Sequence, residues 1–224
     1  GLSIGLGIAL SAKYLEKANF RTYVLLGDGE TAEGQIWEAA EIAAHYKLDN
    51  LIGIIDVNRL GQTGPTMYGH DLEAYRRRFE AFGWDTFTIE DGHSLKQVAQ
   101  TYSDALAASA PAVIIARTLK GKGVSLVEDK NGWHGKILSP KQLEAALAEL
   151  GEIDKSVRGE IRFPDDLGPT PVTRAAPKSA PPAAEAPEPI YAIGEKVATR
   201  EAYGKALVRL FPRFPEMVVL DAEV

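Results

Sequence analysis

The sequence predicts an α/β fold with a doubly wound parallel sheet, because short apolar runs alternate with helical stretches along most of the chain. The runs are rich in isoleucine, valine and leucine, as in parallel strands that helices cover on both faces. Turn-forming residues separate them from the helical stretches. The expected strands are residues 23–26, 51–55, 84–89 and 112–117, and the expected helices between them are residues 35–48, 71–82 and 94–108.

The stretch from Tyr23 to Ile55 is the clearest unit of this pattern. An apolar run ends at Gly27, a helix with one apolar face follows, and a second apolar run begins at Leu51. A right-handed crossover would make the two strands parallel neighbours in one sheet. Asp28 and Asn58 follow the two strands, so both are expected at the carboxyl edge, where open α/β sheets bind ligands.

The residue types at this edge predict a metal-diphosphate site. The Asp28 carboxylate, the Asn58 amide and a nearby backbone carbonyl are oxygen ligands that suit Mg²⁺ or Ca²⁺. Mg²⁺ held by so few protein groups completes its shell with phosphate oxygens and water. Gly29 lets a ligand approach the backbone, and the helix after it offers N–H groups to an anion. The alternative is a glycine turn with an asparagine that satisfies the loop backbone.

Two standard phosphate motifs are absent from this stretch. A P-loop needs lysine and then serine or threonine after its last glycine, but Gln35 and Ile36 follow Gly34. The dinucleotide fingerprint needs a third glycine closer than Gly34 is to Gly29. The site therefore belongs to neither class.

A second candidate segment leaves the last predicted strand of the sheet. The glycine-rich, basic loop from Thr118 to Lys136 starts at the same carboxyl edge and carries Lys120 and His134 as possible ligand contacts. The other three histidines have no second ligand at metal spacing and are expected to be structural. The Arg76–Arg78 run is expected to be a solvated helix face.

The two ends of the chain contain further elements. Residues 1–18 predict a helix in which Gly1, Gly5, Ala9 and Ala12 form a stripe of small residues for close packing. Pro140 opens a helix that ends near Leu150. Near the C-terminus we expect a helix over residues 199–210, capped by its first residue, and a strand over residues 217–221.

Composition divides the chain into three parts. We expect an α/β domain over residues 1–151, an interdomain segment with a Pro/Ala-rich linker over residues 152–195, and the start of a second α/β domain over residues 196–224. The chain begins inside a predicted element and ends at a strand. We therefore expect both domains to be incomplete and the sequence to be a fragment.

Charge and composition restrict the function classes. The formal net charge of −6 argues against a nucleic-acid surface, and 45% hydrophobic residues support a core. Cysteine is absent, as is common in reducing compartments. No apolar run approaches the ~20 residues that span a bilayer. We expect a soluble, cytoplasmic protein with no membrane or nucleic-acid partner.

Two motifs resemble a known family. Gly27-Asp28-Gly29 followed by Asn58 resembles the thiamine diphosphate motif, and the run from Asp56 to Gln62 is similar to transketolases. The resemblance implies the thiamine diphosphate-binding fold and a homodimer whose active sites lie between subunits. It also implies transfer of a two-carbon ketol unit from a ketose phosphate to an aldose phosphate, with thiamine diphosphate and Mg²⁺, or Ca²⁺ in its place.

The resemblance assigns roles to matching residues. It implies that Asp28, Asn58 and the Leu60 carbonyl bind the metal, and that Gly29 and Asn58 touch the diphosphate. Lys120 and His134 would contact the cofactor or the substrate, with His134 assisting proton transfer. The segment from Val197 to Gly204 resembles the start of the family's pyrimidine-binding domain, where Arg200 would bind the sugar substrate.

Two other interpretations remain open at this point. Another thiamine diphosphate enzyme, such as a deoxyxylulose-phosphate synthase, would share the first motif, although the run around Arg59 and the Trp133-His134-Gly135 triplet favour transketolase. A non-catalytic relative would keep the fold and the metal site. The chain lacks the region where the family carries its cofactor-activating glutamate, so we expect the fragment itself to be inactive.

Overall fold

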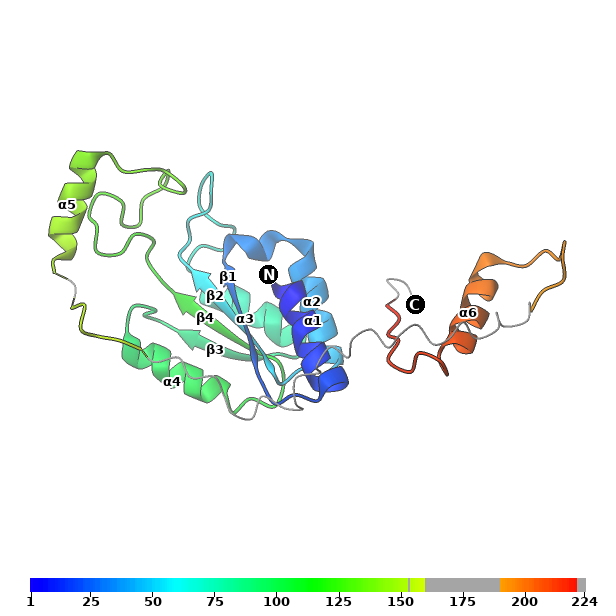
Figure 1. Cartoon of the computed structure of the whole chain (residues 1–224). Coiled ribbons are helices and arrows are strands. Elements are labelled where there is room, and N and C mark those ends of the chain that lie inside the picture. The colour runs from blue at the N-terminus through cyan, green and yellow to red at the C-terminus, as the bar shows by residue number, and fades with distance from the viewer. Residues whose placement is uncertain (153, 160–189, 221–224) are drawn as a thin grey trace. The chain divides into compact units, whose positions relative to one another are not determined.

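The computed structural model describes residues 1–152, 154–159 and 190–220, and the chain divides into two compact units, Gly1–Val172 and Thr173–Val224. Figure 1 shows the first unit as a sheet between helices. Its strands are β1 (Thr22–Gly27), β2 (Leu51–Val57), β3 (Asp85–Ile89) and β4 (Ala112–Arg117). Its helices are α1 (Leu2–Leu10), a π-helix (Ser11–Glu16), a 3₁₀ turn (Gly29–Ala32), α2 (Gly34–His45), α3 (Leu72–Ala81), α4 (Leu95–Ala105) and α5 (Pro140–Leu150). In the second unit, α6 spans Thr199–Leu210.

The strands form one parallel sheet in the order β1-β2-β4-β3. Gly27 of β1 pairs with Asp56 of β2, and Val57 pairs with Arg117 of β4. The residues after these three strands therefore emerge at one edge of the sheet. This confirms the predicted fold class and the predicted position of Asp28 and Asn58.

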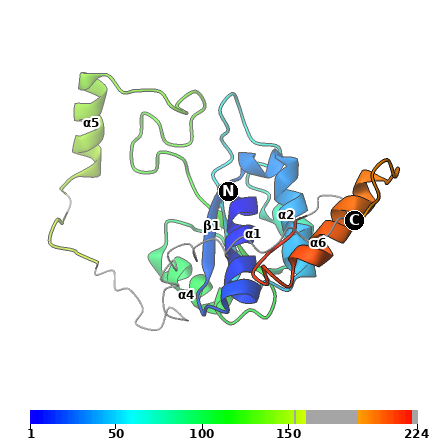
Figure 2. The same ribbon diagram turned by 45° about the vertical axis from the view of Figure 1, so that its right-hand side comes forward.

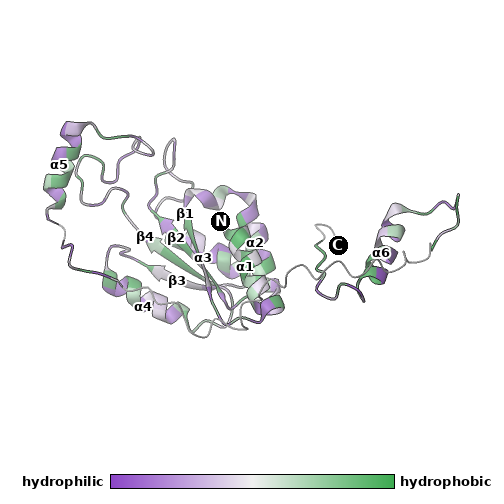
Figure 3. Ribbon diagram, in the orientation of Figure 1, coloured by the Kyte–Doolittle hydropathy of each residue, from purple (hydrophilic) through white to green (hydrophobic). Residues whose placement is uncertain are grey.

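Helices cover the sheet on both faces, as the apolar runs predict (Figures 1 and 2). One core packs α1, α2 and α3 against side chains such as Leu26, Ile55 and Ile115. A smaller core packs α4 against side chains that include Ile52 and Ile114. The central strands β2 and β4 are accordingly apolar over most of their length, and their charged residues, Asp56 and Arg117, lie near the carboxyl ends (Figure 3).

Gly5 explains the stripe of small residues in α1. A Cβ added at Gly5 would lie 2.2 Å from Val24 Cγ2 in β1, whereas one at Gly7 meets nothing within 4 Å. We expect Gly5→Ala to destabilise the fold by about 1–3 kcal/mol through overpacking. Gly7→Ala, the matched control, should stabilise it by about 0.5–1 kcal/mol through helix propensity. Urea unfolding measures both, and equal effects would contradict the packing explanation.

Three predicted elements differ from the structure. The helix over residues 1–18 becomes π-helical at Ser11 and ends at Glu16, because Lys17 takes the left-handed conformation (φ 53°) and Ala18 N–H bonds the Ala12 carbonyl. Residue 199 is the first residue of α6 rather than its cap. Residues 217–220 form no strand, since the described part of the second unit offers no strand to pair with, and residue 221 lies outside the described residues.

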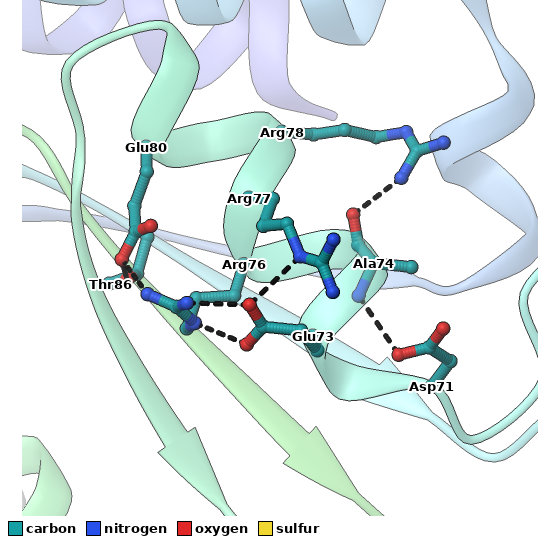
Figure 4. Close-up of polar contacts among 8 residues, drawn as sticks. All are labelled: Asp71, Glu73, Ala74, Arg76, Arg77, Arg78, Glu80 and Thr86. Atoms are coloured by element: carbon teal, nitrogen blue, oxygen red, sulfur yellow. Dashed lines mark hydrogen bonds and ion pairs between the residues drawn. The ribbon is translucent and has the colours of Figure 1, made fainter.

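The Arg76–Arg78 run is accounted for by contacts within and beside α3 (Figure 4). Arg76 and Arg77 pair with Glu73, and Arg76 also pairs with Glu80. Arg78 donates to the Ala74 carbonyl and lies 4.0 Å from the centre of the Tyr68 ring. The three arginines therefore have partners on α3 itself or beside it.

Glu73 provides a test of these pairs by pH. Hydrogen bonding from Arg76 is the largest cause that lowers the pKa of Glu73 to about 2 from its ordinary 4.5. A lowered folded-state pKa adds stability above pH 4.5, which is lost as the pH falls towards 2. We expect the stability difference between the native chain and Glu73→Gln to be present at pH 6 and to shrink over that window, as measured by urea unfolding. A difference that does not vary with pH would contradict the pairing.

No helix in the described ranges combines the length and the apolar character needed to cross a membrane.

Candidate functional site

Asp28 is the buried centre of the candidate site. It is 4% exposed and follows β1 directly, at the start of the 3₁₀ turn. Its Oδ1 accepts from Gly29 N at 2.8 Å, and its Oδ2 accepts from Arg59 N at 2.7 Å and from Thr66 Oγ1 at 2.9 Å. Because Arg59 lies between Asn58 and Leu60, the Asp28 carboxylate lies against the loop that carries the other two predicted metal ligands.

Asn58 is oriented by its neighbours at the end of β2. Its Nδ2 donates to Asp56 Oδ2 at 3.0 Å, and its Oδ1 accepts from Leu60 N at 3.1 Å. Asp56 in turn accepts from the Thr118 hydroxyl after β4. An amide oxygen has two lone pairs, so Asn58 Oδ1 keeps one for a further partner. Asp56 therefore holds the Asn58 amide in place through the hydrogen bond from Nδ2.

The donor set around Asp28 fits a cation. Within the described residues, its carboxylate is bonded by two backbone N–H groups and one hydroxyl, none of which carries charge. A buried carboxylate without a cationic partner is costly, and a bound metal would compensate it. Nearby, burial raises the pKa of Tyr75 to about 12, with the Asp28 charge as the second cause.

The same described residues contain no group of three His, Cys, Asp or Glu side chains that could hold a metal. A metal at Asp28 would therefore depend on one carboxylate together with amide and carbonyl oxygens. That is the oxygen chemistry of Mg²⁺ and Ca²⁺ rather than of zinc.

Open space adjoins Asp28 and Gly29. A cavity of about 150 Å³ is lined by these two residues with Thr31, Trp37 and others. A Cβ on Gly29 would meet only the Thr66 methyl at 3.6 Å, an ordinary contact. The packing of the protein itself does not require glycine at this position, so the residue leaves room for a ligand.

The structure brings Lys120 and His134 together in the loop that leaves β4. Lys120 Nζ lies 2.9 Å from His134 Nδ1, and both side chains are accessible. A protonated lysine can only donate, so Nδ1 accepts and the neutral imidazole carries its proton on Nε2. The second ring nitrogen is therefore available as a donor.

An ion pair connects this loop to the one that carries Asn58 and Leu60. Arg59 donates to Asp129 Oδ2 at 2.6 Å and to the Asp129 carbonyl at 3.2 Å. The Arg59 guanidinium lowers the pKa of the Asp129 carboxyl, and the pair raises the pKa of Arg59. Sequence reasoning missed both residues and Thr66, since no spacing relates one loop to another.

Within the described residues, the other three histidines and Arg200 take no part in the hydrogen bonds of Asp28 and Asn58. His70 Nε2 is 3.0 Å from the Thr118 carbonyl, and His93 Nε2 accepts from Leu119 N at 2.8 Å. Both histidines therefore contact the start of the loop that follows β4. His45 packs edge-on against its neighbour Tyr46. Arg200 is exposed in the first turn of α6 and belongs to the second unit.

Comparisons with known proteins find relatives along the whole chain. Residues 9–161 match the family described as "Transketolase, thiamine diphosphate binding domain". The whole chain is 40% identical to a transketolase of Pongo abelii and 43% identical to a transketolase-like protein 2 of Bos taurus, and covers 34% and 35% of them. It thus spans about a third of the length of these curated relatives.

The solved structures that resemble this chain include two transketolases. A transketolase from Campylobacter jejuni matches 58% of this chain at 31% identity with a TM-score of 0.54, over 21% of its own length. A transketolase variant from Pichia stipitis matches 67% of this chain at 30% identity with a TM-score of 0.57, over 24% of its length.

Proposed function

We propose that this chain, which belongs to the transketolase thiamine diphosphate-binding domain family, binds the diphosphate of thiamine diphosphate through a Mg²⁺ ion. The ion would lie at the carboxyl edge of the sheet. The observation that carries the proposal is the buried Asp28 carboxylate. Among the described residues its hydrogen-bond donors are all uncharged, and it lies against the loop of Asn58 and Leu60. Ca²⁺ would suit the same oxygens.

Each residue has a defined part in this proposal. Asp28, Asn58 Oδ1 and the Leu60 carbonyl would supply oxygen to the metal, while Asp56 keeps the Asn58 amide in place. Gly29 would let the diphosphate approach the backbone beside the open cavity. The metal would neutralise the diphosphate charge at this edge of the sheet.

Lys120 and His134 would complete the site above this edge. The Lys120 ammonium holds the imidazole by Nδ1 and leaves Nε2–H free to donate. His134 would hydrogen-bond the substrate and assist proton transfer there. When bound, thiamine diphosphate supplies the electron sink for carbon–carbon cleavage, and the protein orients it and excludes water.

For the complete protein we propose transfer of a two-carbon ketol unit between sugar phosphates, by a homodimer with its active sites between subunits. Arg200 would contact the sugar substrate in that assembly. A non-catalytic relative would share the metal site, and absence of a cofactor-activating glutamate from the full open reading frame would favour it. The chain alone is proposed to be inactive.

Calorimetry of the full open reading frame tests the cofactor site. Titration with thiamine diphosphate should show binding that requires Mg²⁺ and is lost in EDTA. Gly29→Ala should weaken this binding by about tenfold or more, because the added methyl group would keep the diphosphate away from the backbone. That loss corresponds to roughly one charge-assisted hydrogen bond. Its unfolding free energy should change little, because the added Cβ meets only the Thr66 methyl at 3.6 Å, an ordinary contact. Metal-independent binding would refute the proposal.

A further inference from the structure

Arg59 and Asp129 form an ion pair between two loops that the cofactor proposal treats separately. The metal loop comprises residues 58–66 after β2, and the ligand loop comprises residues 118–136 after β4. The two loops meet at Arg59, which donates to both the carboxylate and the carbonyl of Asp129. Seventy positions separate the partners in sequence. Thr118 already ties the start of the ligand loop to the end of β2, and the pair adds a contact further along both loops.

Both partners have unusual backbone conformations. Arg59 has φ 63° and Asp129 has φ 55°, in the left-handed region that residues other than glycine rarely adopt. Each of these backbone turns needs contacts that hold it. The ion pair supplies one such contact, and the hydrogen bonds that Arg59 N and Asp129 N donate supply two more.

Backbone hydrogen bonds extend the pair in both directions. On one side, Arg59 N donates to Asp28 Oδ2 at 2.7 Å, which fixes the metal loop on the buried carboxylate. On the other side, Asp129 N donates to the Lys120 carbonyl at 2.8 Å, which closes the ligand loop around the residue that holds His134. A continuous set of contacts therefore runs from Asp28 to His134.

We propose that Arg59 and Asp129 are positioning residues, which hold the ligand loop with Lys120 and His134 in register with the metal loop. Through this pair, a cation and diphosphate bound at Asp28 would order the segment that faces the substrate. The coupling to a bound cation and diphosphate rests on the proposed function. The link between the two loops does not, because it is present in the chain without cofactor.

Hydrogen exchange of the full chain without cofactor tests the link. Arg59→Gln and Asp129→Asn should each speed amide exchange in residues 119–130 by roughly fivefold, the upper range for a partly exposed pair. Arg59→Lys keeps a cation and should restore part of the protection. The double variant should exchange no faster than the faster single variant, since the partners share one interaction.

Lys122→Gln is the matched control. Lys122 pairs with Glu128 at 3.8 Å within the ligand loop, so its loss removes an ion pair without separating the loops. This control should leave the exchange of the metal loop unchanged, whereas the Arg59 and Asp129 variants should also speed exchange at Thr66 N, which bonds the Arg59 carbonyl. Unchanged exchange in both variants, or an equal rise across α2, would overturn the inference.

A second measurement separates this inference from the proposed function. Mg²⁺ with thiamine diphosphate should slow exchange of residues 119–130 in the native chain, and Asp129→Asn should abolish that protection while Mg²⁺-dependent binding persists. Protection that survives in Asp129→Asn would overturn the coupling. Failure of the native chain to bind the cofactor would refute the proposed function, and the cofactor-free exchange would then still decide whether the pair links the loops.

Discussion

Asp28→Asn is expected to lower the Mg²⁺-dependent affinity for thiamine diphosphate by more than about 100-fold, because groups that merely support a metal ligand already contribute 10–100-fold. The substitution keeps the shape of the side chain and removes the charge that would balance the metal. It also turns one oxygen into an amide donor that faces Gly29 N–H or the donors on Oδ2, which should cost about 1–3 kcal/mol of stability.

Thr66→Val separates the effect of charge from the effect of a lost hydrogen bond. This variant removes the hydroxyl that bonds Asp28 Oδ2 at 2.9 Å and leaves the carboxylate intact. Its affinity should fall by about tenfold, in line with one hydrogen bond to a charged group. Calorimetry with and without Mg²⁺ measures both variants, and circular dichroism confirms that each folds. Metal-dependent binding that survives undiminished in Asp28→Asn would exclude Asp28 as a metal ligand.

The sequence was sufficient to locate Asp28 and Asn58 at the same edge of the sheet. Apolar runs indicate buried parallel strands, and parallel strands that are neighbours in one sheet end at the same edge. Both steps use regularities of secondary structure that do not depend on loop detail. The same reasoning placed Lys120 and His134 on the loop after β4, because that strand ends at the same edge.

The contacts within the site could not be predicted in this way. Thr66 bonds Asp28 across 38 residues, and Arg59 pairs with Asp129 across 70. Loops lack the periodicity that marks helices and strands, so no pattern relates one loop to another. The π-helical turn after α1 was missed for a different reason, since the run from Ser11 to Glu16 contains no glycine or proline that would mark a change of helix type.

His134→Ala is expected to lower the turnover of the full-length protein by about 100-fold or more, the usual size of a general acid–base contribution. Its affinity for thiamine diphosphate should fall much less, because Asp28 and the metal loop are left intact. Steady-state kinetics and calorimetry on the same preparation distinguish the two effects. An activity loss explained wholly by weaker cofactor binding would place His134 at the cofactor instead.

Two amide substitutions at this position identify what the imidazole does. Lys120 Nζ lies 2.9 Å from Nδ1, so His134→Asn keeps an acceptor near that nitrogen but loses the donor at Nε2. His134→Gln reaches further and can donate near the position of Nε2, yet an amide cannot transfer a proton at neutral pH. If glutamine restores turnover, His134 acts as a hydrogen-bond donor to the substrate. If neither amide restores it while cofactor affinity is retained, proton transfer through Nε2 accounts for the loss, because the Lys120 contact alone would have been preserved by asparagine.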